Sequence, residues 1–292
     1  MELRIEHLSK TYPNGHQALK DVTLTIGRGM FGLLGPNGAG KSTLMRTLAT
    51  LQEADTGTAT LGDIDVLRDK DAVRRTLGYL PQEFGVYPKV SAADLLDHFC
   101  VLKGVIARSD RRALVEQLLK QTNLWESRHK KLGGFSGGMR QRFGIAVALI
   151  GRPRLIIVDE PTAGLDPAER VRFLNLLAEL GEDSIVILST HIVDDVSELC
   201  SRMAIINDGR ILLHDEPVRA IEALRGGVWR KTVAKDEVEA HARAFRIIST
   251  KLFAGRVVLR VAGGERPAPE FEPAEPTLED VYFTTIAGAA AP

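Results

Sequence analysis

The chain has 292 residues, about twice the ~150 residues typical of one domain, so it should fold as one large domain or as two unequal ones. Lysine and arginine number 38, as do aspartate and glutamate, and this zero net charge does not favour non-specific binding to nucleic acid or to an acidic membrane. Hydrophobic residues make up 44% and charged residues 26%, which excludes a wholly disordered chain.

The sequence also predicts the compartment. The N-terminal residues MELRIEHLSK lack the continuous apolar segment of a secretory signal, so the protein is expected to stay in the cytosol. Cys100 and Cys200 match no metal or redox spacing, which favours idle thiols in a reducing compartment. The apolar run 143–150 is among the longest and is far shorter than the roughly 18 residues that cross a bilayer, so a membrane role depends on another chain.

The first elements in chain order are strands. Apolar and polar residues alternate over 3–5 and over 22–26, with the turn signal Asn14-Gly15 between them, which predicts half-exposed antiparallel strands. The apolar run 30–34 then leads into a glycine-rich loop and a helical pattern that begins near Lys41. A strand, a glycine-rich loop and a helix in this order form the phosphate-binding unit of nucleotide-binding α/β folds.

The remaining chain divides into three predicted parts. Apolar residues at three-to-four spacing predict a helical subdomain over about 83–152. The runs 155–158 and 185–188 are continuously apolar, as strands covered on both faces of a parallel sheet require. The composition changes after Pro217, and the segment that follows is predicted to contain short strands at 228–233, 245–248 and 257–261, a proline-rich loop, and an amphipathic helix at 278–286.

The glycine-rich loop satisfies the pattern G-x4-G-K-[ST]. Its residues are Gly35, Pro36, Asn37, Gly38, Ala39, Gly40, Lys41, Ser42 and Thr43. The glycines let successive backbone amides converge on phosphate oxygens at a helix N-terminus, so a nucleoside triphosphate is the natural ligand. Lys41 is predicted to reach the β- and γ-phosphates, and the Ser42 hydroxyl to coordinate Mg²⁺. A glycine-rich turn before a helix is the alternative interpretation.

The strand at 155–158 ends in two carboxylates, Asp159 and Glu160. At the C-terminal edge of a parallel sheet, these side chains would point into the crevice where ligands bind. Asp159 is predicted to hold Mg²⁺, and Glu160 to act as the general base toward the attacking water, which suits hydrolysis. An ordinary strand terminus would show the same pattern, and the phosphate loop is what favours the catalytic interpretation.

The segment FSGGMRQR, residues 135–142, lies upstream of the Asp-Glu strand. With these motifs, the sequence resembles the ATP-binding cassette (ABC) ATPases from Met1 to about Pro217. In that family this signature opens a helix whose amides and serine contact the γ-phosphate bound by the other protomer. The resemblance implies this role for Ser136, Gly137 and Gly138, and the alternative for them is a helix start made of small residues.

Two signature positions depart from the family pattern. Phe135 stands where the family usually has leucine, and Met139 where it usually has glutamine. The second departure removes any contact made through the glutamine amide, and we expect the function to be retained.

The resemblance assigns roles to four further residues. Tyr12 corresponds to the adenine-stacking aromatic, and Gln82 to the hinge glutamine that touches Mg²⁺ or water and couples the site to the helical subdomain. Asp166, in Gly164-Leu165-Asp166, corresponds to the loop that crosses the dimer interface, and His191 to the switch histidine that contacts the γ-phosphate and orients Glu160. The alternatives are a core aromatic, a solvated amide, a helix cap and a structural histidine.

The implied fold is an α/β P-loop NTPase of the ABC type, with a RecA-like core, an antiparallel β subdomain and a helical subdomain. The cassette should span 1–216, and 217–292 should form a small α+β C-terminal accessory domain. In the ABC fold the signature and the phosphate loop face opposite directions, so a complete site requires two protomers arranged head to tail. The presence of both Glu160 and His191 favours a homodimer.

The implied function is hydrolysis of ATP to ADP and phosphate with Mg²⁺, which drives a separate transmembrane permease through ATP-dependent dimerisation. The single cassette without a spanning segment favours a transporter subunit on the cytoplasmic face of the inner (plasma) membrane, with no direct nucleic-acid partner. The tail PTLEDVY, residues 276–282, resembles that of drug, antibiotic and polysaccharide exporter ATPases, which favours export.

The alternative is a soluble ABC ATPase that acts on ribosomes or nucleic acid without a permease. Such a protein would be expected to carry two tandem cassettes and basic linkers. A chromosome-structure or repair ATPase would instead carry long heptad coiled coils between the phosphate loop and the signature. Neither pattern occurs in this sequence.

Overall fold

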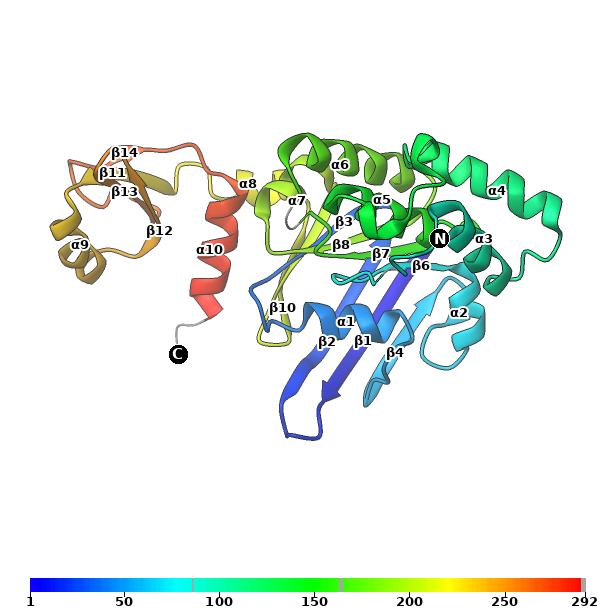
Figure 1. Cartoon of the computed structure of the whole chain (residues 1–292). Helices are drawn as coiled ribbons and strands as arrows, with labels where there is room; N and C mark the ends of the chain where they lie inside the picture. The colour runs from blue at the N-terminus through cyan, green and yellow to red at the C-terminus, as the bar shows by residue number, and fades with distance from the viewer. Residues whose placement is uncertain (86, 163–164, 290–292) are drawn as a thin grey trace.

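The computed structural model describes residues 1–85, 87–162 and 165–289. A six-stranded sheet forms the centre of the molecule, and its strand order is β10-β9-β3-β8-β7-β6 (Figure 1). The inner strands are parallel, and only β10 runs antiparallel to its neighbour β9. The bounds of these strands are Gly29–Leu34 for β3, Leu77–Leu80 for β6, Leu155–Asp159 for β7, Ile185–Thr190 for β8, Arg202–Asn207 for β9 and Arg210–Asp215 for β10.

The two strands that were predicted from continuous apolar runs, β7 and β8, are buried along their whole length. In β7, Ile156 and Val158 face one hydrophobic cluster, and Leu155 and Ile157 face a second cluster on the other side of the sheet. This division follows from the period of two in a strand, because a sheet covered on both faces needs apolar residues at every position. The predicted parallel core is confirmed.

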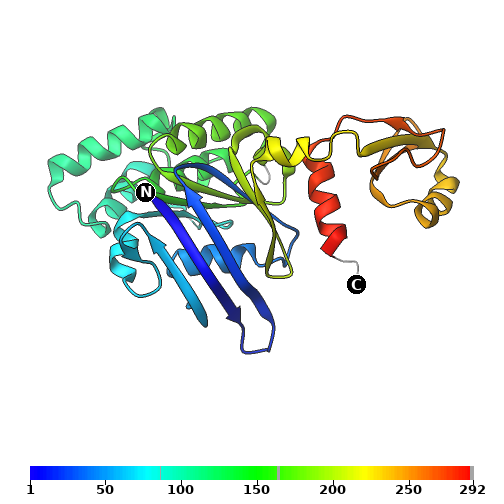
Figure 2. The same cartoon turned by 180° about the vertical axis from the view of Figure 1, so that it is seen from behind.

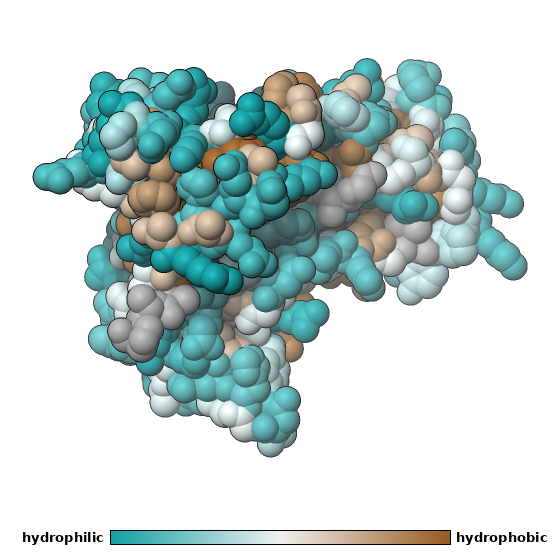
Figure 3. Space-filling model, turned by 90° about the vertical axis from the view of Figure 1, so that its left-hand side faces the viewer, coloured by the Kyte–Doolittle hydropathy of each residue, from teal (hydrophilic) through white to brown (hydrophobic). Residues whose placement is uncertain are grey.

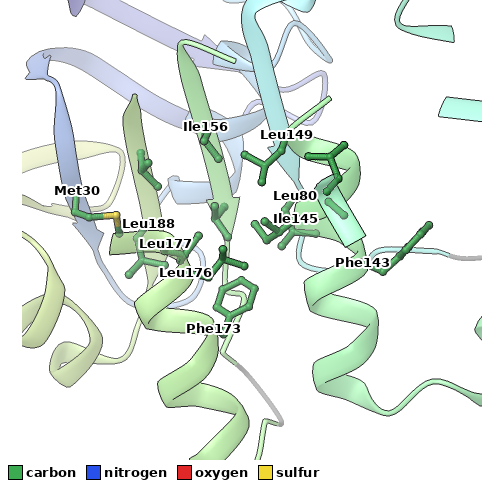
Figure 4. Packing of buried hydrophobic residues seen from close by; sticks show 14 of the residues in the cluster. Met30, Leu80, Phe143, Ile145, Leu149, Ile156, Phe173, Leu176, Leu177 and Leu188 are labelled. Carbon is green, nitrogen blue, oxygen red and sulfur yellow. The ribbon is translucent and has the colours of Figure 1, made fainter. Parts of the chain in front are cut away.

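Helices cover one face of this sheet. Figure 4 shows Leu177 of α6 beside Leu188 of β8, and Ile145 of α5 beside Leu80 of β6. The helices of this side are α3, α4, α5, α6 and α7, with bounds Ala92–Leu102, Arg108–Gln121, Gly137–Ala148, Pro167–Gly181 and Val193–Leu199. The first three, together with two short 3-10 turns at Trp125–Ser127 and Leu132–Gly134, make the predicted helical subdomain.

A four-stranded sheet with the order β2-β1-β4-β5 covers the other side. The bounds are Glu2–Thr11 for β1, Gln17–Gly27 for β2, Thr56–Leu61 for β4 and Ile64–Asp65 for β5. Ile5 pairs with Leu24 across the antiparallel β1 and β2, and the turn between these strands contains Gly15 with a positive φ of 82°. Helices α1 (Lys41–Leu48) and α2 (Lys70–Thr76) complete this layer. Both predicted N-terminal strands and their turn are confirmed.

The C-terminal segment forms a third sheet, with the order β12-β13-β11-β14, which lies apart from the other two in both views (Figures 1 and 2). Its own cluster consists of Val233, Val257 and Leu259. The strands are β11 (Val228–Val233), β12 (Ile247–Phe253), β13 (Arg256–Ala262) and β14 (Glu272–Pro273), and helix α9 spans Val238–Ala244.

Two helices connect this sheet with the rest of the molecule. Ala220 of α8 (Pro217–Glu222) and three residues of α10 (Leu278–Ala289) belong to the same hydrophobic cluster as the central sheet. These three residues of α10 are Leu278, Val281 and Tyr282. The side of the molecule that carries the third sheet is mostly hydrophilic, with hydrophobic residues scattered among the polar ones (Figure 3).

One predicted strand is displaced. The interval 245–248 was expected to be extended, but the strand begins at Ile247 and continues to Phe253. Phe245 lies before it and packs edge-on against Phe271, with ring centroids 5.0 Å apart. The strand extends further because Ala254 and Gly255, both with positive φ, turn the chain into β13. Among the described residues, no helix combines the length and the apolar character needed to span a bilayer.

Candidate functional site

The glycine-rich loop follows the central strand β3 and ends at the N-terminus of α1. Gly40 is the N-cap of α1 and has a φ of 106°, a conformation that favours glycine. A Cβ at this position would also lie 2.5 Å from the carbonyl oxygen of Ala18. The loop is therefore held closely against β2 and ends at the N-terminus of α1, where an anion is stabilised.

Lys41 is buried at the base of this loop. Its Nζ atom donates to the carbonyl oxygens of Gly35, at 2.7 Å, and Pro36, at 3.1 Å, and it lies 3.7 Å from Oε1 of Glu160. Burial lowers the pKa of Lys41, while the negative charges of Glu160 and Asp159 oppose that shift. The structure thus places the lysine of the loop beside the carboxylate that was predicted to be the general base.

Glu160 is the point at which three predicted residues meet. Besides Lys41, Nδ1 of His191 lies 3.2 Å from its Oε1, and Nε2 of Gln82 donates to its Oε2 at 3.3 Å. Glu160 itself has a φ of 48°, an uncommon value for a residue with a side chain. Its backbone N–H donates to the carbonyl oxygen of Ser189 at 2.8 Å, which ties this strained residue to the next strand.

Asp159 precedes Glu160 and is only 3% exposed. Its Oδ1 atom has no hydrogen-bond partner among the described residues, and neither has Oγ of Ser189, which stands opposite Asp159 in the register of β7 and β8. A buried carboxylate oxygen without a partner is costly unless a cation or donor satisfies it. Oδ1 of Asp159 and the hydroxyl of Ser42 are oxygen ligands of the hard kind that suits Mg²⁺.

Tyr12 lies at the end of the hairpin between β1 and β2. Its hydroxyl is 3.1 Å from Oγ1 of Thr43 and donates to Oε1 of Gln52 at 3.2 Å. The amide of Gln52 in turn donates to the carbonyl oxygen of Thr43 at 3.0 Å. These bonds hold the half-buried tyrosine ring beside the phosphate loop. This position is compatible with stacking on a base and differs from that of a core aromatic residue.

A pocket of about 450 Å³ lies over the phosphate loop, and Asp159 and His191 are not among its described lining residues. Among the described residues, its lining consists of loop residues 36–43 together with Tyr12, His16, Ala18, Gln82 and Glu160. His16 and Ala18 were not predicted from the sequence as part of the site. The available signal was the turn at Asn14-Gly15, because a hairpin brings the residue after the turn opposite Tyr12, whose N–H donates to the carbonyl oxygen of His16 at 2.9 Å.

The signature residues do not line this pocket. Ser136 is the N-cap of α5 and accepts a hydrogen bond from the N–H of Met139, while Gly138 faces Glu169 of α6. Asp166 is the N-cap of α6 and accepts from the N–H of Glu169 at 2.8 Å, so a capping role is present. Gly164 lies outside the described residues.

The two residues that depart from the signature pattern pack against neighbouring side chains. Phe135 is 4% exposed and packs edge-on against Phe143, with ring centroids 6.4 Å apart. Met139 is half-buried and packs against the cluster of the helical side. Both side chains therefore contribute to the hydrophobic cluster on the helical side.

Comparison with known proteins gives the family. The model of a family described as "ABC transporter" matches residues 19–163. The uncharacterized ABC transporter ATP-binding protein YxlF of Bacillus subtilis (strain 168) is 38% identical over 97% of this chain and 99% of its own length. The daunorubicin resistance ATP-binding protein DrrA2 of Streptomyces coeruleorubidus is 34% identical over 92% of this chain and 80% of its own length.

Two further similarities concern assembly and length. The probable multidrug ABC transporter ATP-binding protein YbhF of Escherichia coli (strain K12) is 30% identical over 98% of this chain, which spans 52% of that relative. Among solved structures, the dimeric post-hydrolysis state of the ATP-binding cassette MJ0796 bound to ADP and Pi has a TM-score of 0.66 and 27% identity. It covers 73% of this chain and 98% of its own.

The chain belongs to the family of ABC transporter ATP-binding proteins. It is an ATPase that binds ATP and hydrolyses it as a subunit of an ABC transporter. The expected ABC cassette fold is confirmed, and nothing in these similarities favours the soluble alternative. ABC ATP-binding subunits work with transmembrane components and form dimeric cassettes.

Proposed function

We propose that this chain is the Mg²⁺-dependent ATPase subunit of an exporter, and that it works as a homodimer on a separate membrane permease. The observation that carries the proposal is the convergence of Lys41, Gln82 and His191 on the carboxylate of Glu160 at the edge of the phosphate-loop pocket. A carboxylate held by an ammonium, an amide and an imidazole is positioned to act on one water molecule next to a bound triphosphate.

In the proposed reaction, Glu160 accepts the proton of the attacking water, while Lys41 and the amides of the loop bind the phosphates. His191 and Gln82 orient the carboxylate from two sides, through Oε1 and Oε2 respectively. Ser42, Gln82 and Asp159 would hold Mg²⁺, which supplies charge neutralisation for the phosphates when bound. The ring of Tyr12 would stack on the adenine.

The proposed dimer follows from what the pocket contains. Its lining within the described chain includes the phosphate loop, but Ser136, Gly137, Gly138 and Asp166 stand at the starts of α5 and α6 instead. A second copy arranged head to tail would bring these residues to the γ-phosphate. ATP would then close the dimer, and hydrolysis would reopen it.

A groove on the helical side suits the permease. It has a volume of about 840 Å³, and its apolar lining includes Leu77 and Tyr79 of β6 and Phe99 and Leu102 of α3. The side chain of Leu102 is largely exposed, as expected of a surface that another protein covers. Because β6 leads directly to Gln82, a permease segment seated here would act on the same strand that positions the hinge glutamine.

We assign residues 1–216 to the cassette and 217–292 to the accessory segment, whose helices α8 and α10 dock on the cassette and whose sheet has its own small core. The proposed location is the cytoplasmic face of the inner (plasma) membrane, where the permease would hold the subunit. Export is favoured by the tail at 276–282 and by the relatives whose names refer to multidrug transport or daunorubicin resistance.

The test is the substitution Glu160→Gln in the full-length chain. The amide keeps the shape of the side chain but cannot accept the proton of the water, so ATP should still bind while hydrolysis stops and a closed, ATP-bound dimer accumulates. Size-exclusion chromatography with light scattering measures the dimer, and phosphate release measures turnover.

The matched control is Glu53→Gln, which changes an exposed glutamate paired with Lys70 at 2.8 Å. This variant should hydrolyse ATP at the wild-type rate and show the same oligomeric state as the wild type, with and without ATP. Wild-type turnover in Glu160→Gln would contradict the assignment of the base, and ATP-bound Glu160→Gln that stays monomeric would contradict the dimer.

A further inference from the structure

A buried carboxylate outside the nucleotide pocket connects three segments of the site. Asp195, on α7, is 0% exposed. Its Oδ2 accepts a hydrogen bond from Oγ1 of Thr162 at 2.6 Å. Its Oδ1 accepts from Nε of Arg170 at 2.8 Å, and Nη2 of Arg170 lies 2.6 Å from the same oxygen. Thr162 is itself 4% exposed, so this contact is shielded from water.

Each of the three residues in this contact belongs to a different segment of the proposed active site. Thr162 follows Glu160 in the segment that leaves β7. Arg170 lies in the first turns of α6, the helix that Asp166 caps, and its N–H donates to the carbonyl oxygen of Asp166. Asp195 lies in the first turn of α7, directly after the segment that carries His191. One carboxylate thus binds the segments of the base, of the interface loop and of the switch histidine.

Breaking the hydrogen bonds of Asp195 would be energetically costly. A buried carboxylate needs all of its donors, because leaving it partly unpaired costs the desolvation of a charge. Burial alone would lower the pKa of Arg170, but the hydrogen bond and the charge of Asp195 outweigh it and raise the pKa, so the arginine remains a charged donor. Neither the Thr162 segment nor α7 can therefore move without breaking or carrying along the other.

We propose that Asp195 is a positioning residue for ATP hydrolysis, which acts through Thr162 and Arg170 to hold Glu160 and His191 in their mutual arrangement. This inference rests on the roles proposed above for Glu160 and His191. It predicts that the chemical step depends on the hydroxyl of Thr162 and on the charge of Asp195, while ATP binding at the phosphate loop does not.

The experiment measures single-turnover hydrolysis and the Kd for ATP in the full-length chain. Thr162→Val keeps the shape of the side chain and removes the hydroxyl, Thr162→Ser keeps the hydroxyl, and Asp195→Asn removes the charge. We expect Thr162→Val and Asp195→Asn each to slow hydrolysis by about tenfold or more, with the Kd for ATP within about threefold of wild type. Thr162→Ser should stay within about twofold, and the double variant should be no slower than the slower single variant.

Asp280→Asn is the matched control. Asp280 is 1% exposed, accepts from Oγ1 of Thr277 at 2.9 Å and binds Arg260 through both oxygens at 2.7 Å. It therefore reproduces the chemistry of Asp195 in the C-terminal segment. Asp280→Asn should lower the melting temperature, as a buried pair requires, yet keep the single-turnover rate within about twofold.

A wild-type rate of hydrolysis in Thr162→Val would overturn the inference. This test remains valid even if Asp195→Asn does not fold. Equal slowing by Asp280→Asn would overturn it as well, because a general loss of stability would then explain both results. Glu160→Gln is measured in parallel and separates the two hypotheses. If Glu160→Gln abolishes hydrolysis and Thr162→Val does not slow it, only the positioning role of Asp195 is contradicted. If Glu160→Gln hydrolyses ATP normally, the proposed role of Glu160 as general base is contradicted, whatever the result for Thr162→Val.

Discussion

The carboxylate of Glu160 and the imidazole of His191 lie 3.2 Å apart, although they come from different strands of the central sheet. Glu160 follows β7 and His191 follows β8, and these two strands are parallel neighbours, so their C-terminal ends lie at the same edge. The N–H of Glu160 bonds to the carbonyl of Ser189 in β8, which sets the spacing of the two segments. Sheet register therefore decides which side chains meet at this edge of the sheet.

Lys41→Ala should weaken ATP binding, because the buried ammonium proposed to bind the phosphates is lost. We expect the Kd for ATP, measured by isothermal titration calorimetry, to rise by at least about tenfold, corresponding to ~1.4 kcal/mol. Lys103→Ala is the control, because Lys103 also donates to two backbone carbonyls, those of Arg74 and Leu77, away from the loop. An unchanged Kd in Lys41→Ala would remove the assignment of the phosphate loop.

Chelation of Mg²⁺ should stop hydrolysis, and Asp159→Asn should raise the Mg²⁺ concentration that gives half-maximal hydrolysis by about tenfold. The reason is that the buried Oδ1 of Asp159, which has no partner in the described part of the chain, would lose its negative charge. Asp208→Asn changes an exposed aspartate paired with Lys20 and should leave this concentration unchanged. The same Mg²⁺ dependence in Asp159→Asn and wild type would argue against a metal ligand at this position.

Gly138→Ala should destabilise the protein and impair ATP-driven dimerisation. The new Cβ would lie 2.5 Å from Oε2 of Glu169, so the Glu169 side chain would have to move and its pair with the buried Arg142 would be disturbed. We expect a loss of about 1–3 kcal/mol in the free energy of unfolding, measured with urea.

Gly134→Ala tests whether this effect is specific to the contact with α6. Its Cβ would approach only Cε of Lys130, at 3.2 Å, and that side chain can move away. The unfolding free energy of this variant should change by less than about 0.5 kcal/mol. Equal stability of Gly138→Ala and Gly134→Ala would show that the contact with Glu169 is unimportant.

The two thiols should be unreactive in the folded protein. Burial raises the pKa of Cys100 to about 11 and that of Cys200 to about 12, so at pH 8 both stay protonated, and the thiolate is the reactive form. Iodoacetamide should label neither in the native state and both in urea, as mass spectrometry would show. Cys100→Ala should lose one label in urea only. Rapid labelling of the native protein at pH 8 would mean that these side chains are accessible.

The local motifs and their order could be predicted from the sequence. The glycines in the loop from Gly35 to Thr43 predict a tight turn before α1, where Gly40 has a positive φ. The continuous apolar run of β7 predicts a strand that is covered on both faces. The strands predicted at 228–233 and 257–261 are present as β11 and β13. These features depend on neighbouring residues, so a short stretch of sequence determines them.

Only the tertiary structure decided which distant residues meet. Sheet order placed β7 between β6 and β8, and this order brings Gln82 and His191 to opposite oxygens of Glu160. Asp195 has no motif, and only its complete burial between α6 and α7 distinguishes it from the exposed Asp194 nearby. Such contacts depend on how strands pair and helices pack across the whole chain, and no local pattern of residues encodes them.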